Sequence, residues 1–239
     1  DGGKDNFETD AAGLAAGGYV AAFSRQSPAT FSQSSHSCYN SGSCSSGNCY
    51  PYSYYSNNKH YTKYTGSKTR DQQILLRWYN TMDEVVKTVQ VLDREDTSSW
   101  SYSCSSQSGY GSYASPFGQV SVATTPSGST VILFKDGNAV KGKIYNADGT
   151  MTKDFGTLGT GWTGFDVAAH NDDSVLIVWS DGNNLHGQTY TPSGEPDGSQ
   201  LTISDAAGTQ AWPAVDTYIN GRFVVAWEDT QAGGDANIV

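Results

Sequence analysis

The chain has 239 residues and a mass of 25.5 kDa, which is enough for one large all-β domain or two small ones. With 36% hydrophobic and 16% charged residues and 27 glycines, it is too polar and turn-rich for a helical bundle, and its 15 tyrosines and 6 tryptophans exclude a disordered chain. The net charge of −10 argues against nucleic acid as a partner, and no stretch approaches the roughly 20 apolar residues of a membrane-spanning helix.

Five short apolar segments, each ending in an aromatic residue, recur along the chain. In chain order they are YVAAF (19–23), ILLRW (74–78), TVILF (130–134), VLIVW (175–179) and FVVAW (223–227). Short runs of β-branched and aromatic residues bounded by turn formers predict buried strands. A strand that recurs in this way predicts a repeat protein.

The residues around these segments predict three partner strands for each. Asp136-Gly137 and Asp181-Gly182 follow two of the segments and are typical of hairpin turns, because glycine accepts a positive φ. Each unit would then have four antiparallel strands, which predicts an all-β fold of the β-propeller type with each apolar second strand between neighbouring blades. The repeat cores are expected near 7–26, 59–96, 117–156, 165–204 and 213–239, in a single domain (1–239) with insertions at 27–58 and 97–116.

Three stretches resemble a repeat of large secreted microbial surface and adhesin-type proteins. They are LAAGGYVAAFS (14–24), LHGQTYTPSGEPDGSQLTIS (185–204) and QAWPAVDTYINGRFVVAWEDTQAGGDANIV (210–239). The repeat reads roughly P-x-V-A, then G-G-F-V-V-x-W, a Gly/Asp turn and Y-G-Q-x-Y-D-x-x-G. The resemblance covers most of 9–24 and 117–239 and fails in the insertions. It implies propeller blades and a secreted or cell-surface location, and it carries no catalytic residue.

The four cysteines lie in the two insertions: Cys38, Cys44 and Cys49 in the first, Cys104 in the second. Their spacing does not match the C-x-x-C pairs of zinc ribbons, and no histidines cluster beside them, so two disulfides of a secreted protein are expected in preference to zinc. Three connectivities are open. One bridge would join the two insertions through Cys104, and the other would close a short loop.

The first insertion and the start of the following repeat are rich in tyrosine. The expected contact residues are Tyr50, Tyr52, Tyr54, Tyr55 and Tyr61. Tyrosines separated by serine and asparagine resemble the composition of binding loops, and their rings can stack on sugars. The strip is interpreted as a contact surface for protein or glycan. The alternative is that these rings pack around the disulfides as the small core of the insertion.

The last repeat reaches only its third strand, at Ala236, Asn237, Ile238 and Val239. A sheet that lacks a strand exposes unpaired backbone N–H and C=O groups, which another chain can pair with. Three explanations stay open. The chain is part of a longer repeat protein, or a neighbouring subunit supplies the missing strand and builds a filament, or residues 1–6 close the ring from the other side.

Motifs of serine hydrolases, zinc proteases and nucleotide-binding enzymes are absent from the sequence. Acidic pairs such as Asp172-Asp173 fall in expected turns, where aspartate bonds the local backbone. No cofactor is therefore expected, although turns such as 146–149 and 171–174 offer oxygen ligands for Ca²⁺ as an alternative. No N-glycosylation acceptor occurs, so any glycan on this chain would be O-linked.

These features together predict a secreted, non-enzymatic structural or adhesive protein, one protomer of an extracellular filament or surface assembly. The expected partners are copies of the same repeat protein and, with the tyrosine strip, glycans. Nucleic acid and a membrane span are not expected. The alternatives are a carbohydrate-binding module that uses the tyrosine strip, and a propeller-type lyase or glycoside hydrolase.

Overall fold

The computed structural model describes residues 5–26, 30–38, 44–45, 48–49, 61–101, 117–218, 221–230 and 236–239, with side chains at 9–26, 71–95 and the described residues from 117 on. Every regular element among them is a β-strand, which confirms the all-β prediction. None of these residues forms a helix that is long and apolar enough for a bilayer crossing. The chain divides into a repeat unit (Asn6–Arg25, Gln73–Asp93 and Pro116–Val239) and an insertion unit (Asp1–Asp5, Gln26–Gln72 and Arg94–Ser115).

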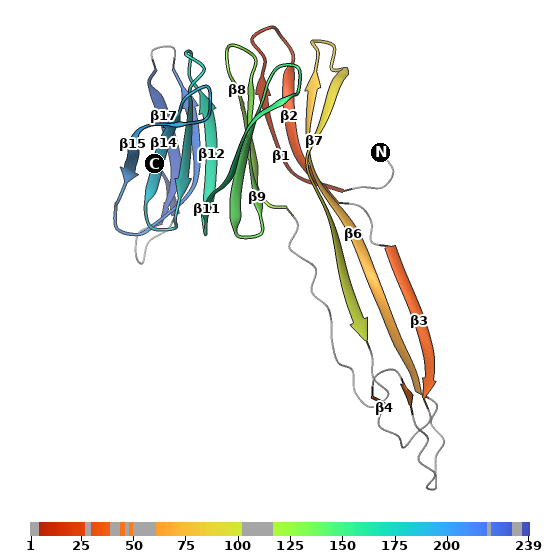
Figure 1. The fold of residues 1–239 in the computed structure, drawn as a ribbon. Coiled ribbons are helices and arrows are strands. Elements are labelled where there is room, and N and C mark those ends of the chain that lie inside the picture. The colour runs from red at the N-terminus through yellow and green to blue at the C-terminus, as the bar shows by residue number, and fades with distance from the viewer. Residues whose placement is uncertain are drawn as a thin grey trace. The chain divides into compact units, whose positions relative to one another are not determined.

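The described strands are numbered in chain order (Figure 1). They are β1 (Asp5–Gly13), β2 (Tyr19–Gln26), β3 (Thr30–Cys38), β4 (Cys44–Ser45), β5 (Asn48–Cys49), β6 (Tyr61–Tyr79), β7 (Val85–Ser101), β8 (Val120–Thr124), β9 (Thr130–Asp136), β10 (Ala139–Tyr145), β11 (Met151–Thr160), β12 (Gly164–Ala169), β13 (Val175–Ser180), β14 (Leu185–Tyr190), β15 (Pro196–Ser204), β16 (Thr209–Thr217), β17 (Phe223–Thr230) and β18 (Ala236–Ile238).

Four sheets make up the repeat unit. The first has the order β1-β2-β6-β7, the second β8-β9-β10-β11, the third β12-β13-β14-β15 and the fourth β16-β17-β18. Consecutive strands of the second, third and fourth sheets pair in antiparallel register. The four-stranded units predicted from residues 117–156 and 165–204 are therefore confirmed, and the last sheet has three described strands.

The insertion unit contains the pairing of β3 with the first half of β6, from Thr30 opposite Thr69 to Cys38 opposite Tyr61. The strands β4 and β5 form a separate two-stranded pair, with Cys44 opposite Cys49. Strands β6 and β7 contribute residues to both units, because each continues from the first sheet into the insertion unit.

The prediction of five repeats is wrong at its beginning. Segments 19–23 and 74–78 lie on β2 and β6, which are neighbouring strands of the first sheet. The 27–58 insertion thus interrupts one sheet between its second and third strands and does not separate two repeats. Segment 74–78 has the same pattern as a second strand because it is equally buried, with Ile74 and Leu76 fully covered.

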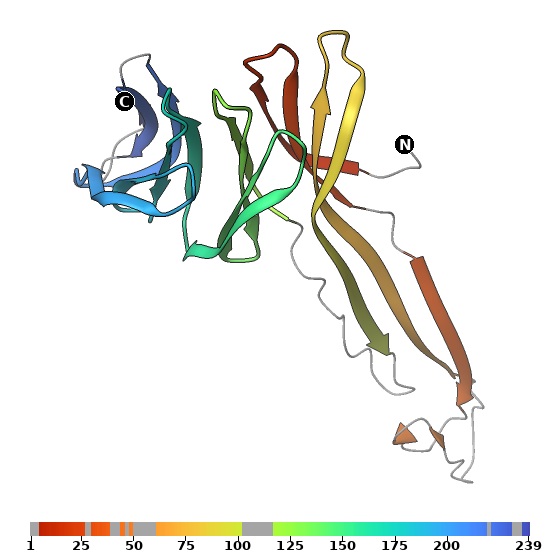
Figure 2. The same ribbon diagram turned by 45° about the horizontal axis from the view of Figure 1, so that its top comes forward.

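Two apolar clusters fill the spaces between consecutive sheets. The first joins the first and second sheets, and its members include Val20, Ala22, Ile74, Leu76, Trp78, Val122, Ile132 and Phe134. The second joins the second and third sheets, and its members include Val131, Leu133, Val140, Phe165, Val167, Val175 and Ile177. Alternate residues of β9 therefore face opposite neighbours, and Figure 2 shows the second sheet (green) between β1–β2 and the third sheet. This double burial explains why second strands read as continuous apolar runs.

Candidate functional site

One hydrogen bond recurs between the first strands of consecutive sheets. Asp10 Oδ2 accepts from the Val122 N–H at 2.7 Å, Ser121 Oγ from the Val167 N–H at 3.3 Å, and Asp166 Oδ2 from the Val215 N–H at 2.8 Å. Ser121 and Asp166 are equivalent by register. Each follows the residue that pairs with the aromatic residue at the end of the neighbouring apolar segment, Phe134 or Trp179. All three junctions between consecutive sheets thus share one acceptor position, which we call the latch.

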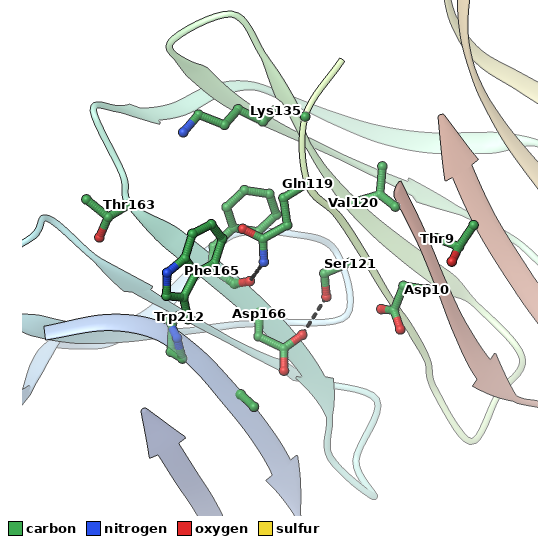
Figure 3. Close-up of a pocket in the computed structure, with 13 residues that line it drawn as sticks. Thr9, Asp10, Gln119, Val120, Ser121, Lys135, Thr163, Phe165, Asp166 and Trp212 are labelled. Carbon is green, nitrogen blue, oxygen red and sulfur yellow. Dashed lines mark hydrogen bonds between the residues drawn. The ribbon is translucent and has the colours of Figure 1, made fainter. Parts of the chain in front are cut away.

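The latch residues border a pocket of about 570 Å³ in the repeat unit (Figure 3). It is lined by Thr9, Asp10, Gly118, Gln119, Val120, Ser121, Lys135, Thr163, Phe165, Asp166, Trp212, Pro213 and Ala214. These residues come mainly from β1, β8, β12 and β16, the first strand of each sheet. The pocket is therefore a product of the way in which first strands converge, and no single stretch of sequence contains it.

Trp212 is the aromatic side chain most open to solvent in this pocket, with 60% of its surface exposed. It stands at a bulge in β16, where the register shifts between Ala211 and Ala214, and its φ of 49° lies in the left-handed region. Its backbone packs on Gly164, where an added Cβ would lie 3.0 Å from the Trp212 N and Cα atoms. A strained, exposed tryptophan held by its backbone is typical of a binding position.

The Asp166 carboxylate of the pocket is partly buried and hydrogen-bonded. Burial raises the pKa of Asp166, the hydrogen bonds from Ser121 and from the Val215 and Val167 backbone lower it, and the nearby Asp10 charge raises it, with a net upward shift. The Ser121 hydroxyl donates to Asp166 Oδ1 at 2.6 Å. Asp166 is thus a desolvated carboxylate that the protein holds in place from two sheets.

Polar groups opposite the carboxylates are also fixed. The Lys135 ammonium donates to the Trp162 carbonyl at 3.0 Å, and the Gln119 amide donates to the Phe165 carbonyl at 2.6 Å. The pocket therefore combines carboxylate acceptors, ammonium and amide donors, and one exposed indole. That combination can bind a hydroxyl-rich molecule.

The fourth sheet presents a second feature, which we call its outer face: Asp216, Val224, Ala226, Glu228 and Ile238. Register places Val224 opposite Asp216 and Ile238 opposite Glu228, on the side of the sheet that alternates with the buried Asp229. No described residue of a further sheet covers this side. Val224 is 49% and Ile238 79% exposed, and Ala226 is exposed as well.

The same positions in the second and third sheets are buried. Val224 corresponds to Val131 and Leu176, Ala226 to Leu133 and Val178, and Ile238 to Val140 and Leu185, all with 0–1% of their surface exposed. The third sheet covers these side chains of the second sheet, and the third sheet in turn contacts β16 of the fourth through β12, β13 and β14. The outer face of the fourth sheet therefore corresponds to a surface that is buried between two sheets elsewhere in the chain, but no described sheet covers it.

The predicted pairing edge forms the last described strand of this sheet. Ala236, Asn237 and Ile238 make up β18, and Val239 exchanges two backbone hydrogen bonds with Trp227, at 3.0 and 3.2 Å. All four residues are exposed. Pairing of this edge with another chain stays a prediction.

Most residues of the tyrosine strip and one of the four cysteines fall outside the described part of the chain. Tyr50, Tyr52, Tyr54, Tyr55 and Cys104 lie outside the described residues. Tyr61 begins β6 opposite Cys38, and Cys44 lies opposite Cys49. The expected contact surface and disulfides therefore stay predictions.

The acidic turns have local partners. Asp172 accepts from the Ser174 N–H and hydroxyl, and Asp148 accepts from the Thr150 N–H. These bonds lower the pKa of both carboxyls. Among residues with described side chains, no three His, Cys, Asp or Glu come close enough to hold a metal ion.

Two features of this site were missed by the sequence interpretation. The recurring latch is invisible as a motif because its acceptor is Asp in two sheets and Ser in the other. Trp212 was overlooked because it stands outside the five apolar segments, although the proline that follows it, Pro213, marks an irregular backbone.

Comparison of the chain with known protein families and with curated proteins finds no match.

Proposed function

We propose that this protein is a secreted, non-enzymatic structural or adhesive repeat protein, and that its sheets are the blades of a β-propeller-type assembly built from more than one copy. The observation that carries the proposal is the outer face of the fourth sheet. Its Val224 is about half exposed and its Ile238 is largely exposed, whereas their counterparts in the second and third sheets are fully buried. A surface that repeats the chemistry of a buried interface is suited to binding another sheet.

The energy available at this face is substantial. Full burial of a valine or isoleucine side chain contributes about 1.5–3 kcal/mol, so covering half of Val224 and most of Ile238 contributes about 3 kcal/mol. That free energy corresponds to roughly a hundredfold in a dissociation constant. The β18 edge adds backbone hydrogen bonds if a strand pairs with it.

The test is concentration-dependent assembly of the purified chain, measured by light scattering and viewed by electron microscopy. The double variant Val224→Asp, Ile238→Asp should weaken association by about a hundredfold or more. Leu201→Asp is the matched control, because Leu201 is an exposed apolar residue on β15 in the third sheet. A wild-type chain that stays monomeric at every concentration contradicts the proposal.

The proposal includes two disulfides in the insertion unit, Cys44–Cys49 and Cys38–Cys104. Directly opposed residues of an antiparallel pair have Cα atoms about 4.5–5.5 Å apart, inside the range that a disulfide spans, and Cys44 is opposed to Cys49. Peptide mapping without reductant tests this connectivity. Recovery of a Cys44 peptide joined to Cys104 or Cys38 contradicts it.

Carbohydrate binding is a second candidate function, now centred on the pocket instead of the tyrosine strip. It is favoured by Trp212, an exposed indole beside two carboxylates and an ammonium group. A screen against immobilised neutral glycans should show binding that Trp212→Ala abolishes and that Tyr52→Ala, Tyr54→Ala leaves intact. Absence of binding by the wild-type chain contradicts this candidate, and loss only in the tyrosine variant returns the site to the insertion.

A further inference from the structure

The first sheet also has a side that no other described sheet covers, and we call it the first-sheet face. It comprises Tyr19, Phe23 and Arg25 on β2 with Arg77 and Tyr79 on β6. The intervening residues Val20, Ala22, Ile74, Leu76 and Trp78 belong to the core against the second sheet. Because side chains alternate along a strand, the residues of the first-sheet face lie on the opposite side.

The first-sheet face carries aromatic rings and two arginines, and strand alternation places Asp71 on the same side of β6. Tyr19 and Tyr79 stack with ring centroids 4.7 Å apart, and the Arg77 guanidinium lies 5.0 Å from the Phe23 ring centroid. Phe23 is only 7% exposed. Arg77 therefore covers the ring of Phe23, as a neighbouring sheet covers the ring of Phe134, the aromatic residue that ends the apolar segment of β9. This side of the molecule is therefore not a second apolar surface of the kind seen on the fourth sheet.

Both arginines have unused hydrogen-bonding capacity. The Nε atoms of Arg25 and Arg77 are buried and have no hydrogen-bond partner within the described part of the chain. A buried guanidinium N–H without an acceptor costs free energy. Both side chains are only partly buried, and a carboxylate that reaches the exposed part of a guanidinium forms charge-assisted hydrogen bonds with it. The two arginines of the first-sheet face are therefore suited to an anionic partner.

The outer face of the fourth sheet carries two carboxylates, Asp216 and Glu228. Glu228 pairs with Ile238 on the third strand of its sheet. Lys135 and Ser180 hold the same position in the second and third sheets, because they pair with Val140 and Leu185 on the third strands there. The Lys135 ammonium donates to the Trp162 carbonyl, in the loop before the third sheet, and the Ser180 hydroxyl donates to the Gln210 carbonyl on β16 of the fourth sheet. Glu228 is thus at the position from which a side chain reaches the following sheet, but it offers an acceptor where the others offer a donor.

The latch of the internal junctions is missing on both of these faces. On the fourth sheet the latch position holds Ala214, which has no side-chain acceptor. On the first sheet the N–H after the latch residue belongs to Ala11, and it already donates to Asp10 Oδ1 at 2.8 Å. A contact between the two faces would therefore differ from the internal junctions and would depend on the side-chain charges.

We propose that the outer face of the fourth sheet in one copy binds the first-sheet face of a second copy, with Asp216 and Glu228 meeting Arg25 and Arg77. This inference rests on the proposed function and names the partner surface for it. The contact joins two different surfaces head to tail, so it either closes a ring or continues as a filament. Two copies contribute eight sheets, which falls within the four to eight blades of β-propellers.

Charge reversal tests this pairing. Variant A carries Arg25→Glu and Arg77→Glu, and variant B carries Asp216→Lys and Glu228→Lys. Each variant alone sets like charges against each other and should associate at least about tenfold more weakly than the wild-type chain. An equimolar mixture of A and B restores opposite charges at every contact and should associate again, as should a single chain with all four substitutions. Added salt should weaken the wild-type association.

The outcomes separate the inference from the proposed function. A monomeric wild-type chain contradicts both. If variants A and B associate as strongly as the wild-type chain, only the inference is contradicted, because some other surface is then the partner. Failure of both variants and of their mixture, with circular dichroism and melting curves showing that A and B are folded, also contradicts the charge pairing.

Discussion

Replacing Asp166 with alanine removes the latch that joins the third sheet to the fourth. The substitution deletes the acceptor of the Val215 N–H at 2.8 Å and of the Ser121 hydroxyl at 2.6 Å. A hydrogen bond to a charged group contributes about 1.5–3 kcal/mol. Burial of the carboxylate opposes this gain, as its raised pKa shows, so the expected loss is about 2–3 kcal/mol and not the sum of two bonds.

Urea denaturation followed by circular dichroism measures this loss, and the melting temperature should fall by roughly 5–10 °C. Asp166→Asn should cost less than about 1 kcal/mol, since the amide oxygen can accept from Val215 and the amide N–H can donate to Ser121. Asp205→Ala is the control, because Asp205 is exposed in a turn. A loss below about 0.5 kcal/mol for Asp166→Ala, or an equal loss for the asparagine variant, refutes the role of the latch.

The same residue predicts a dependence on pH. In the unfolded chain an aspartate titrates near pH 3.9, whereas burial raises the pKa of Asp166 in the folded protein. The folded protein therefore holds the proton of Asp166 more tightly than the unfolded chain does. The stability that Asp166 contributes is complete below the unfolded pKa and decreases as the pH rises from about 4 through the folded pKa. The difference in unfolding free energy between the wild-type chain and Asp166→Asn, measured across this range, should show that slope.

Three further predictions concern other parts of the repeat unit. Gly142→Ala should cost about 1–3 kcal/mol in urea unfolding, because the new Cβ would lie 2.9–3.0 Å from Leu133, Leu158 and Phe155, whereas Gly187→Ala, with its nearest atom at 3.1 Å, should cost less. Burial, and then the Asp154 charge, raise the pKa of Tyr145 to about 12. The stability that Tyr145 contributes should therefore decline above about pH 10. In an ultraviolet titration, Tyr145→Phe should remove one phenol that titrates at high pH. Partial burial raises the pKa of Asp181, but hydrogen bonds with Asn184, His186 and Asn183 lower it to about 2. The stability that Asp181 contributes is therefore present above about pH 4 and is lost as the pH falls toward 2. The unfolding free energy of Asp181→Ala should lack this loss between pH 4 and pH 2 in acid unfolding.

Much of the fold could be predicted because strand burial leaves a direct mark on composition. The segments 130–134 and 175–179 are covered on both sides, so they read as unbroken apolar runs, and their hairpin turns carry glycines at positive φ, Gly137 and Gly182. The repeat count failed because burial does not distinguish the second strand of a sheet from the third. The run at 74–78 therefore looked like a new repeat, although β6 pairs with β2.

The candidate sites were less predictable, since their residues come together only through packing. The latch joins positions 46 to 112 residues apart in the chain, and its acceptors are of two residue types. The exposure of Ile238 could not be inferred from its identity, because its counterparts Val140 and Leu185 are equally apolar and fully buried. Trp212 is a site residue only because a bulge turns it toward strands from other sheets.

Local patterning by itself determined that this chain is all β, where its hairpins turn, and which strands are buried on both sides, because alternation, apolar runs and glycine turns act over a few residues. Tertiary structure alone decided that two apolar runs share one sheet and that first strands of different sheets enclose a pocket. It also decided that the fourth sheet has an apolar and acidic face that no described sheet covers, and that two arginines lie on the first-sheet face. The physical reason is that burial and charge complementarity are properties of neighbours in space, and those neighbours lie tens of residues apart in the chain.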